Sequence, residues 1–80
     1  MTQLTLYHTS GCHLCEQAEA LLLACLDAKG TAADSLRLAD IADDEELFKR
    51  YGLLIPVLRV ECTGQELNWP FGLGDIQRLL

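Results

Sequence analysis

Two cysteines three residues apart, Cys12 and Cys15, are the residues of this sequence best placed to do chemistry. They lie where a short β-prone run, residues 4–8, gives way to a helical pattern. Ser10 and Gly11, between this run and Cys12, favour a helix cap and a turn. Two thiols one helical turn apart can form and break a disulfide bond with each other. The pattern therefore indicates thiol–disulfide exchange.

Apolar residues recur after Cys12 at helical spacing, at Leu14, Ala18, Leu21, Leu22 and Cys25. This places Cys12 at a helix N-terminus, where unpaired N–H groups and the helix dipole stabilise a thiolate. Thiols so placed have a pKa of roughly 3.5–7.5 instead of about 8.5, so we expect a lowered pKa for Cys12. Cys15 should be less exposed and less ionised, which suits a resolving thiol, whereas Cys12 is the expected nucleophile.

The chain has 80 residues, of which 50% are hydrophobic, and we expect one domain over residues 1–80 with one two-layer core. No apolar run approaches the ~20 residues of a membrane span, and residues 1–3 lead directly into strand material. We therefore expect a cytoplasmic protein without membrane contact. In such a reducing compartment, a close cysteine pair is better explained by catalysis or metal binding than by a structural disulfide framework.

The formal net charge is −6, and the six basic residues are scattered along the chain. Nucleic-acid binding requires clustered lysine and arginine side chains, so the charge pattern argues against this function. An acidic surface also gives no long-range attraction to anionic small molecules such as glutathione.

The other two cysteines, Cys25 and Cys62, are expected to be small buried hydrophobic residues. Cys25 lies ten residues beyond Cys15 on the same predicted helix, about 15 Å along its axis. Disulfide partners need Cα atoms within about 7 Å, so Cys15 and Cys25 cannot pair with each other. A zinc site needs four ligands, and only His8 and His13 remain near the first cysteine pair, so no metal site is expected.

The hydrophobic periodicity and the turn signals predict elements in the order βαβαββα. The expected elements are a strand over residues 3–8, a helix over 13–28, a strand over 35–40 after a loop at 31–34, a helix within 40–52, a strand that opens at Pro56 within 53–62, a strand over 66–69 and a helix over 75–80. The first strand, the first helix and the second strand are expected to form a βαβ unit with a right-handed crossover and two parallel strands.

Three features coincide in this chain: Cys-x-x-Cys at the start of the first helix, Ile55-Pro56-Val57 at the start of the third strand, and the order of elements. Together they resemble the thioredoxin superfamily, and the runs over residues 6–12 and 50–58 are similar to a small glutaredoxin-like family within it. The resemblance implies an α/β fold with a four-stranded mixed sheet in order 2-1-3-4 and helices on both faces. It also implies a cis Ile55–Pro56 bond beside the thiols and a backbone at Ile55 that pairs with an extended substrate.

The sequence departs from glutaredoxins around the dithiol. His13 and Leu14 stand where proline and tyrosine are usual, Thr9 replaces a basic residue, and residues 69–75 replace the paired glycines that help to hold glutathione. His13 has two interpretations: it hydrogen-bonds the Cys12 thiolate and tunes it, or it is a neutral peripheral side chain.

Further candidates each have a functional and a structural interpretation. Asp75 caps the last helix or receives a ligand's amino group, and Arg50, like Lys49, holds a carboxylate or complements a helix dipole. His8 ends the first strand and points toward the same region. Trp69 and Phe71 line a substrate groove or pack the last helix onto the sheet.

These features predict a thiol–disulfide oxidoreductase that acts on a disulfide-containing protein or a small glutathione-type disulfide, with Cys12 attacking and Cys15 resolving. No bound cofactor is expected. A second thiol donor, glutathione as co-substrate or a thioredoxin system, must restore the dithiol. Two alternatives stay open: a thioredoxin-fold binding module without turnover, and a metal- or cluster-binding protein.

Overall fold

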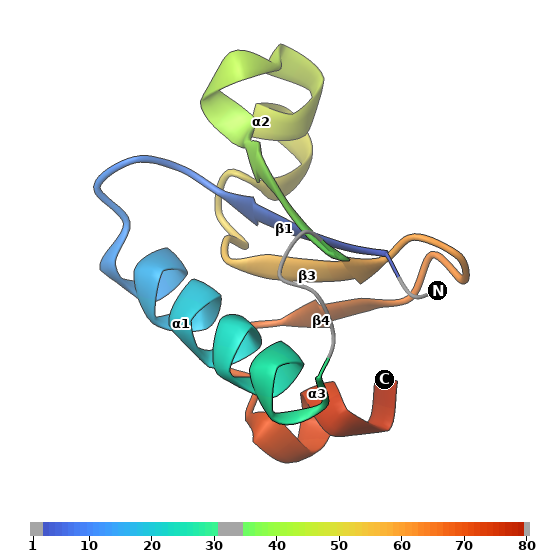
Figure 1. Cartoon of the computed structure of the whole chain (residues 1–80). Coiled ribbons are helices and arrows are strands. Elements are labelled where there is room, and N and C mark those ends of the chain that lie inside the picture. The colour runs from blue at the N-terminus through green and yellow to red at the C-terminus, as the bar shows by residue number, and fades with distance from the viewer. Residues whose placement is uncertain (1–2, 31–34, 80) are drawn as a thin grey trace.

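The computed structural model describes residues 3–30 and 35–79, and the predicted loop at 31–34 lies outside them. Its elements are β1 (Leu4–His8), α1 (His13–Ala28), β2 (Leu36–Asp40), the short 3-10 helix η2 (Ile41–Asp43), α2 (Glu45–Tyr51), β3 (Val57–Val60), β4 (Glu66–Asn68) and α3 (Leu73–Leu79) (Figure 1). The order of strands and α-helices is the predicted one.

The four strands form one mixed sheet in the order β2-β1-β3-β4, which confirms the expected topology. β1 runs parallel to β2 and antiparallel to β3, and β3 runs antiparallel to β4. Tyr7 near the end of β1 pairs with Val57 at the start of β3, and Val57 pairs with Asn68 at the end of β4. The segments that follow β1, precede β3 and follow β4 therefore leave the sheet at the same end.

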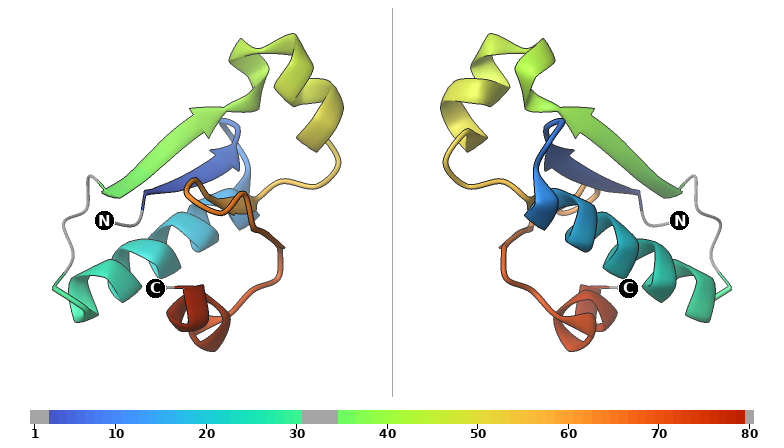
Figure 2. Two further views of the ribbon diagram at one scale, coloured as in Figure 1. Left: turned by 90° about the vertical axis from the view of Figure 1, so that its right-hand side faces the viewer. Right: turned by 90° about the vertical axis from the view of Figure 1, so that its left-hand side faces the viewer.

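The larger core cluster lies between the sheet and the pair of helices α1 and α3, which cover one face (Figure 1). Its buried members include Leu4 and Leu6 of β1, Leu22 of α1, Leu58 of β3 and Ile76 of α3. Alternate residues of a strand point to opposite faces, so the next β1 side chain, Tyr7, belongs to the smaller cluster on the α2 side. The two clusters explain why helices flank the sheet on both faces (Figure 2).

The buried face of α1 differs from the predicted one at its start and at its end, where Leu26 is buried, and the predicted Leu21 is only partly buried. The buried residues are Cys15, Ala18, Leu22, Cys25 and Leu26. Leu14 is 47% exposed, so the prediction that it belongs to the apolar stripe is wrong. Adjacent helical residues are about 100° apart around the axis, so burying Cys15 turns Leu14 away from the core.

On the other face, α2 is held by the side chain of Tyr51 at its last turn. The Tyr51 ring stacks on that of Tyr7, with ring centroids 4.3 Å apart, and its hydroxyl donates a hydrogen bond to Glu66 of β4. Asp44 caps the other end of α2, because its Oδ1 atom accepts from the N–H groups of Glu46 and Leu47. The acidic run thus serves as a helix start, as its position before basic residues predicted.

Two further expectations need correction. The last helix begins at Leu73 rather than Asp75, because the Ile76 N–H bonds to the Gly72 carbonyl and adds residues 73–74 to the helix. Cys62 is exposed, whereas Cys25 is buried as expected; Cys62 lies beyond the end of β3, in the turn that leads to β4. Within the described ranges, no helix is long and apolar enough to span a membrane.

Candidate active site

Cys12 is the N-cap residue of α1, in the turn that follows β1. Gly11 precedes it with φ +75°, a left-handed conformation that residues with a side chain rarely adopt, so the chain can turn sharply into the helix. Cys12 itself is extended, and its Sγ atom accepts a hydrogen bond from the backbone N–H of Cys15 at 3.1 Å. The sulfur therefore occupies the position of a capping side-chain oxygen and faces the free N–H groups of the first turn.

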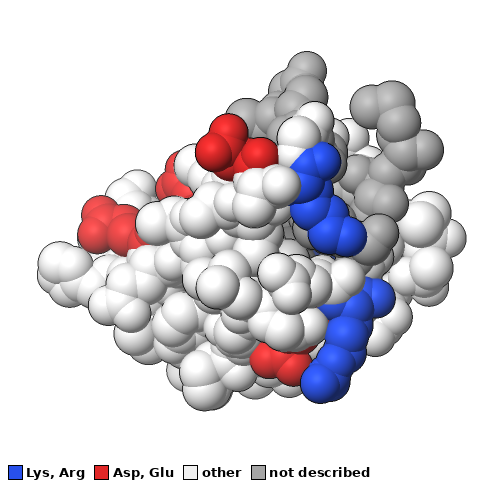
Figure 3. All heavy atoms as spheres, turned by 60° about the horizontal axis from the view of Figure 1, so that its bottom comes forward, with Lys and Arg blue, Asp and Glu red and all other residues white. Residues whose placement is uncertain are grey.

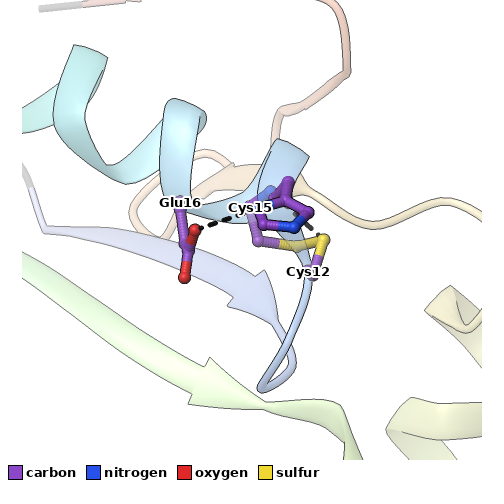
Figure 4. The surroundings of a disulfide bond; sticks show 4 residues. Cys12, Cys15 and Glu16 are labelled. Carbon is purple, nitrogen blue, oxygen red and sulfur yellow. Dashed lines mark hydrogen bonds and ion pairs between the residues drawn. A yellow bond between two sulfur atoms is a disulfide. The ribbon is translucent and has the colours of Figure 1, made fainter.

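Cys12 and Cys15 are joined by a disulfide bond, with their Cα atoms 5.2 Å apart (Figure 4). The two cysteines differ in burial: Cys12 is partly exposed, whereas Cys15 is only 3% exposed and belongs to the buried face of α1. An external disulfide can thus approach the sulfur of Cys12 more readily than that of Cys15. This geometry agrees with the expected order of exposure.

His13 lies on the outside of the first turn, with its side chain 91% exposed. Its Nδ1 atom is 3.5 Å from Oε2 of Glu16, which is one turn further along the helix. This contact favours the interpretation of His13 as a peripheral residue. His8 is the half-buried last residue of β1 and pairs with Asp40 of β2.

The segment before β3 reaches the same end of the sheet as Cys12. Pro56 is buried and directly precedes Val57, the residue that pairs with Tyr7. Both Ile55–Pro56 and Trp69–Pro70 are cis peptide bonds, and the second was not expected from the sequence. The N–H of Ile55 donates to the Tyr51 carbonyl at 3.1 Å, so this N–H already has a partner within the protein, and pairing of Ile55 with a substrate stays a prediction.

The charged candidates make contacts within the protein. Oδ2 of Asp75 accepts from the N–H of Gly72 at 2.9 Å and so helps to start α3. The guanidinium of Arg50 lies 5.5 Å from the ring centroid of Tyr51. Lys49 pairs with Glu45 at 3.6 Å. The structural interpretations explain these positions, and ligand binding by Arg50 and Asp75 stays a prediction.

The aromatic candidates pack against the larger core. The rings of Trp69 and Phe71 meet edge to face with centroids 5.2 Å apart, and Phe71 is 5% exposed. Phe71 belongs to the cluster that contains Ile76, and the partly buried Trp69 packs against this cluster, which supports the interpretation that they pack α3 onto the sheet. Among the residues that the structure describes, no three His, Cys, Asp or Glu side chains are grouped so that they could hold one metal ion.

Two features of the structure were not recognised in the sequence. Leu53 and Leu54 are fully and about half exposed in the segment that precedes Pro56, although their apolar run resembles a buried strand. On the α2 face, a pocket of about 190 Å³ is lined by Thr5, Tyr7, Arg37, Ala39, Leu47 and Glu61. Strand alternation places Thr5 and Tyr7 on one face of the sheet. The position of α2 over this face, which completes the pocket, depends on tertiary packing that the sequence pattern does not contain.

A four-stranded mixed sheet with a cysteine pair at the N-terminus of the first helix defines a thioredoxin-like protein. The family model of the glutaredoxin-like domain (DUF836) matches residues 3–80, so the chain belongs to this family. A search of curated proteins gave no match.

Two solved structures show the same fold in similar proteins. The X-ray structure of the structural genomics target protein XcR50 from X. campestris has 39% sequence identity and a TM-score of 0.73, over 95% of this chain and 92% of that one. The solution structure of protein Ne2328 from Nitrosomonas europaea has 28% identity and a TM-score of 0.80, over 99% of this chain and 91% of that one.

Proposed function

We propose that this protein is a thiol–disulfide oxidoreductase with Cys12 as the nucleophile and Cys15 as the resolving thiol. One observation carries the proposal: the partly exposed sulfur of Cys12 caps α1 and is within bonding distance of the buried sulfur of Cys15. The position of Cys12 at the helix start makes its sulfur accessible and stabilises the thiolate. The closeness of Cys15 gives an intramolecular route to release a bound substrate. Membership of the glutaredoxin-like family supports the same chemistry.

The reaction consists of two exchange steps. The Cys12 thiolate attacks one sulfur of a substrate disulfide, forms a mixed disulfide with it and releases the other half as a thiolate. Cys15 then loses its proton and attacks the Cys12 sulfur, which releases the second half and forms the Cys12–Cys15 disulfide. Two electrons pass from the protein dithiol to the substrate disulfide.

The oxidised protein must then be reduced by another thiol. Two glutathione molecules, or one dithiol of a thioredoxin system, supply the two electrons needed, and no bound cofactor takes part. Such donors keep thiols reduced in the cytoplasm, which is the compartment that we propose for this protein.

The test is a redox titration of the reduced protein across a series of reduced-to-oxidised glutathione ratios, read by intact mass and peptide mapping. We expect a reversible Cys12–Cys15 disulfide with one midpoint, and the same result for a Cys62→Ser variant. A stable glutathione adduct on Cys12 without the internal disulfide would disprove the resolving role of Cys15. No reaction at either cysteine would leave a binding module as the better explanation.

A further inference from the structure

We define the dithiol rim as residues 9–15, which include the cysteine pair, together with residues 53–56 and 69–74. They leave the sheet at one end, because Val57 pairs with both Tyr7 and Asn68. In the right-hand view of Figure 2, the start of α1 faces the viewer, and the segments before β3 and after β4 lie on the same side of it. A substrate that reaches Cys12 therefore meets these segments.

The rim exposes large apolar side chains. Of the seven large hydrophobic residues that are exposed in the described parts of the chain, four belong to it: Leu14, Leu53, Leu54 and Leu73. Leu53 is fully exposed and the other three are about half exposed. Single exposed leucines are common, but a group of them around one site is typical of a surface that binds another molecule.

The rim contains no lysine or arginine. Two carboxylates flank it instead: the exposed Glu16, 3.5 Å from His13, directly after the first segment, and the partly exposed Asp75, 4.0 Å from Arg78, directly after the third. On the face drawn in Figure 3, the lysine and arginine side chains lie toward the right, one of them beside an acidic group, whereas the left, the side on which α1 begins in Figure 1, is acidic and uncharged. Such a surface disfavours a substrate with several carboxylates and favours an apolar or basic one.

The backbone at the rim offers limited hydrogen bonding to a substrate strand. The N–H of Ile55 is already bonded to the Tyr51 carbonyl, so its carbonyl alone can accept a hydrogen bond from an extended chain. Apolar side-chain contacts must therefore supply most of the orientation of a bound substrate.

On the basis of the proposed redox function, we propose that the substrate of the dithiol rim is an extended, cysteine-containing segment of another polypeptide with apolar and basic neighbours of its cysteine. The leucines of the rim cover the apolar side chains, and Glu16 and Asp75 face the basic ones. Glutathione has two carboxylates and little apolar surface, so it offers neither apolar side chains to the leucines nor basic side chains to Glu16 and Asp75.

The test compares symmetric disulfides of short peptides in which the cysteine is flanked either by leucine and lysine or by serine and glutamate. The reduced protein converts each peptide disulfide to two peptide thiols and becomes oxidised at Cys12–Cys15, and stopped-flow mixing with mass detection gives the second-order rate constant. We expect the leucine and lysine peptide to react at least about tenfold faster than the other peptide and than glutathione disulfide, since burial of one leucine provides about this factor. Equal rate constants, or a faster reaction with glutathione disulfide, would overturn the proposal.

The variant Leu53→Ser/Leu54→Ser tests the surface directly, because these exposed side chains contribute little to packing. We expect the ratio of the rate constants for the two peptides to fall from its wild-type value to close to one. Leu38→Ser, which removes an exposed leucine from β2, is the matched control and should keep the ratio. An unchanged ratio in the rim variant contradicts the assignment. Hydroxyethyl disulfide, small and uncharged, separates the two proposals: if it does not oxidise the wild-type dithiol, the redox function itself fails.

Discussion

The backbone N–H of Cys15 donates a hydrogen bond to the Sγ atom of Cys12, 3.1 Å away, at the first turn of α1. The same N–H can bond to the thiolate when the disulfide is reduced, and the helix dipole adds to its effect. Both interactions favour the charged form of Cys12, which is also the form that attacks a disulfide.

The first prediction concerns the pH dependence of this thiol. In reduced protein with the Cys62→Ser substitution, alkylation of Cys12 by iodoacetamide should rise with pH through a midpoint well below the free-thiol pKa of about 8.5. Peptide mapping of timed samples measures the rate. A Cys15→Ala variant keeps the backbone donor and should keep the low midpoint, whereas a midpoint at or above that of a free thiol would contradict the capping argument. A low midpoint would also mean that the thiolate stabilises the reduced protein above the unfolded pKa and that this contribution is lost as the pH falls through the folded pKa.

A second prediction follows from the difference in burial between the two cysteines. Cys15→Ser should stop the reaction at a mixed disulfide on Cys12, because no thiol remains close enough to release the substrate: the buried Cys25 lies ten residues further along α1. Cys12→Ser should form no such adduct at Cys15, whose sulfur is almost inaccessible. Intact mass after incubation with a peptide disulfide distinguishes these outcomes, and Cys62→Ser should complete the reaction like the wild type. Adduct formation at Cys15 in the Cys12→Ser protein would show that the assigned roles are wrong.

The sequence predicted the position of the dithiol because several local signals agree there. Ser10 and Gly11 end the strand, and the apolar periodicity begins at once, so the helix bounds of residues 13–28 were correct. The assignment of Leu14 to the core failed for a specific reason: Leu14 and Cys15 are both apolar, and periodicity alone admits either as the start of the buried stripe. Packing against the sheet decides between them.

Other parts of the fold depend on contacts that no local pattern contains. The apolar run over residues 53–55 has strand-like composition, yet the hydrogen bonds from the N–H groups of Leu54 and Ile55 to the Tyr51 carbonyl fold it into a turn. The bond between Tyr51 and Glu66 joins a helix end to an edge strand 15 residues further along the chain. Such pairs become visible only when the sheet order and register are known.

The third prediction concerns Tyr51 at high pH. Burial, followed by the hydrogen bond and charge of Glu66, raises the pKa of Tyr51 to about 12 from its ordinary value of 10.0. The unfolded chain therefore releases this proton at lower pH than the folded protein, so stability should fall as the pH rises from about 10 to about 12. Urea unfolding across this range, together with ultraviolet absorbance of tyrosinate, measures both effects.

Two variants sharpen this prediction. Tyr51→Phe should lose the decrease in stability that the wild type shows between these pH values. Glu66→Gln should lower the pKa of Tyr51 toward 10, because the hydrogen-bond partner no longer carries a charge. A Tyr51→Phe protein with the same high-pH decrease as the wild type would mean that another group causes it.

The last prediction links the cap of α2 to the segment that approaches the dithiol. Oδ1 of Asp44 accepts hydrogen bonds from the N–H groups of Glu46 and Leu47 at 2.9 and 3.3 Å, and the far end of the same helix holds Ile55 through the Tyr51 carbonyl. Asp44→Ala should lower the free energy of unfolding by about 0.5–2 kcal/mol. It should also lower the hydrogen-exchange protection of the Ile55 amide, since a helix of seven residues depends strongly on its cap. Asp44→Asn retains a capping oxygen and should remain close to the wild type in both measurements. If the asparagine variant loses as much stability as the alanine variant, the charge of Asp44 rather than its hydrogen bonds stabilises α2.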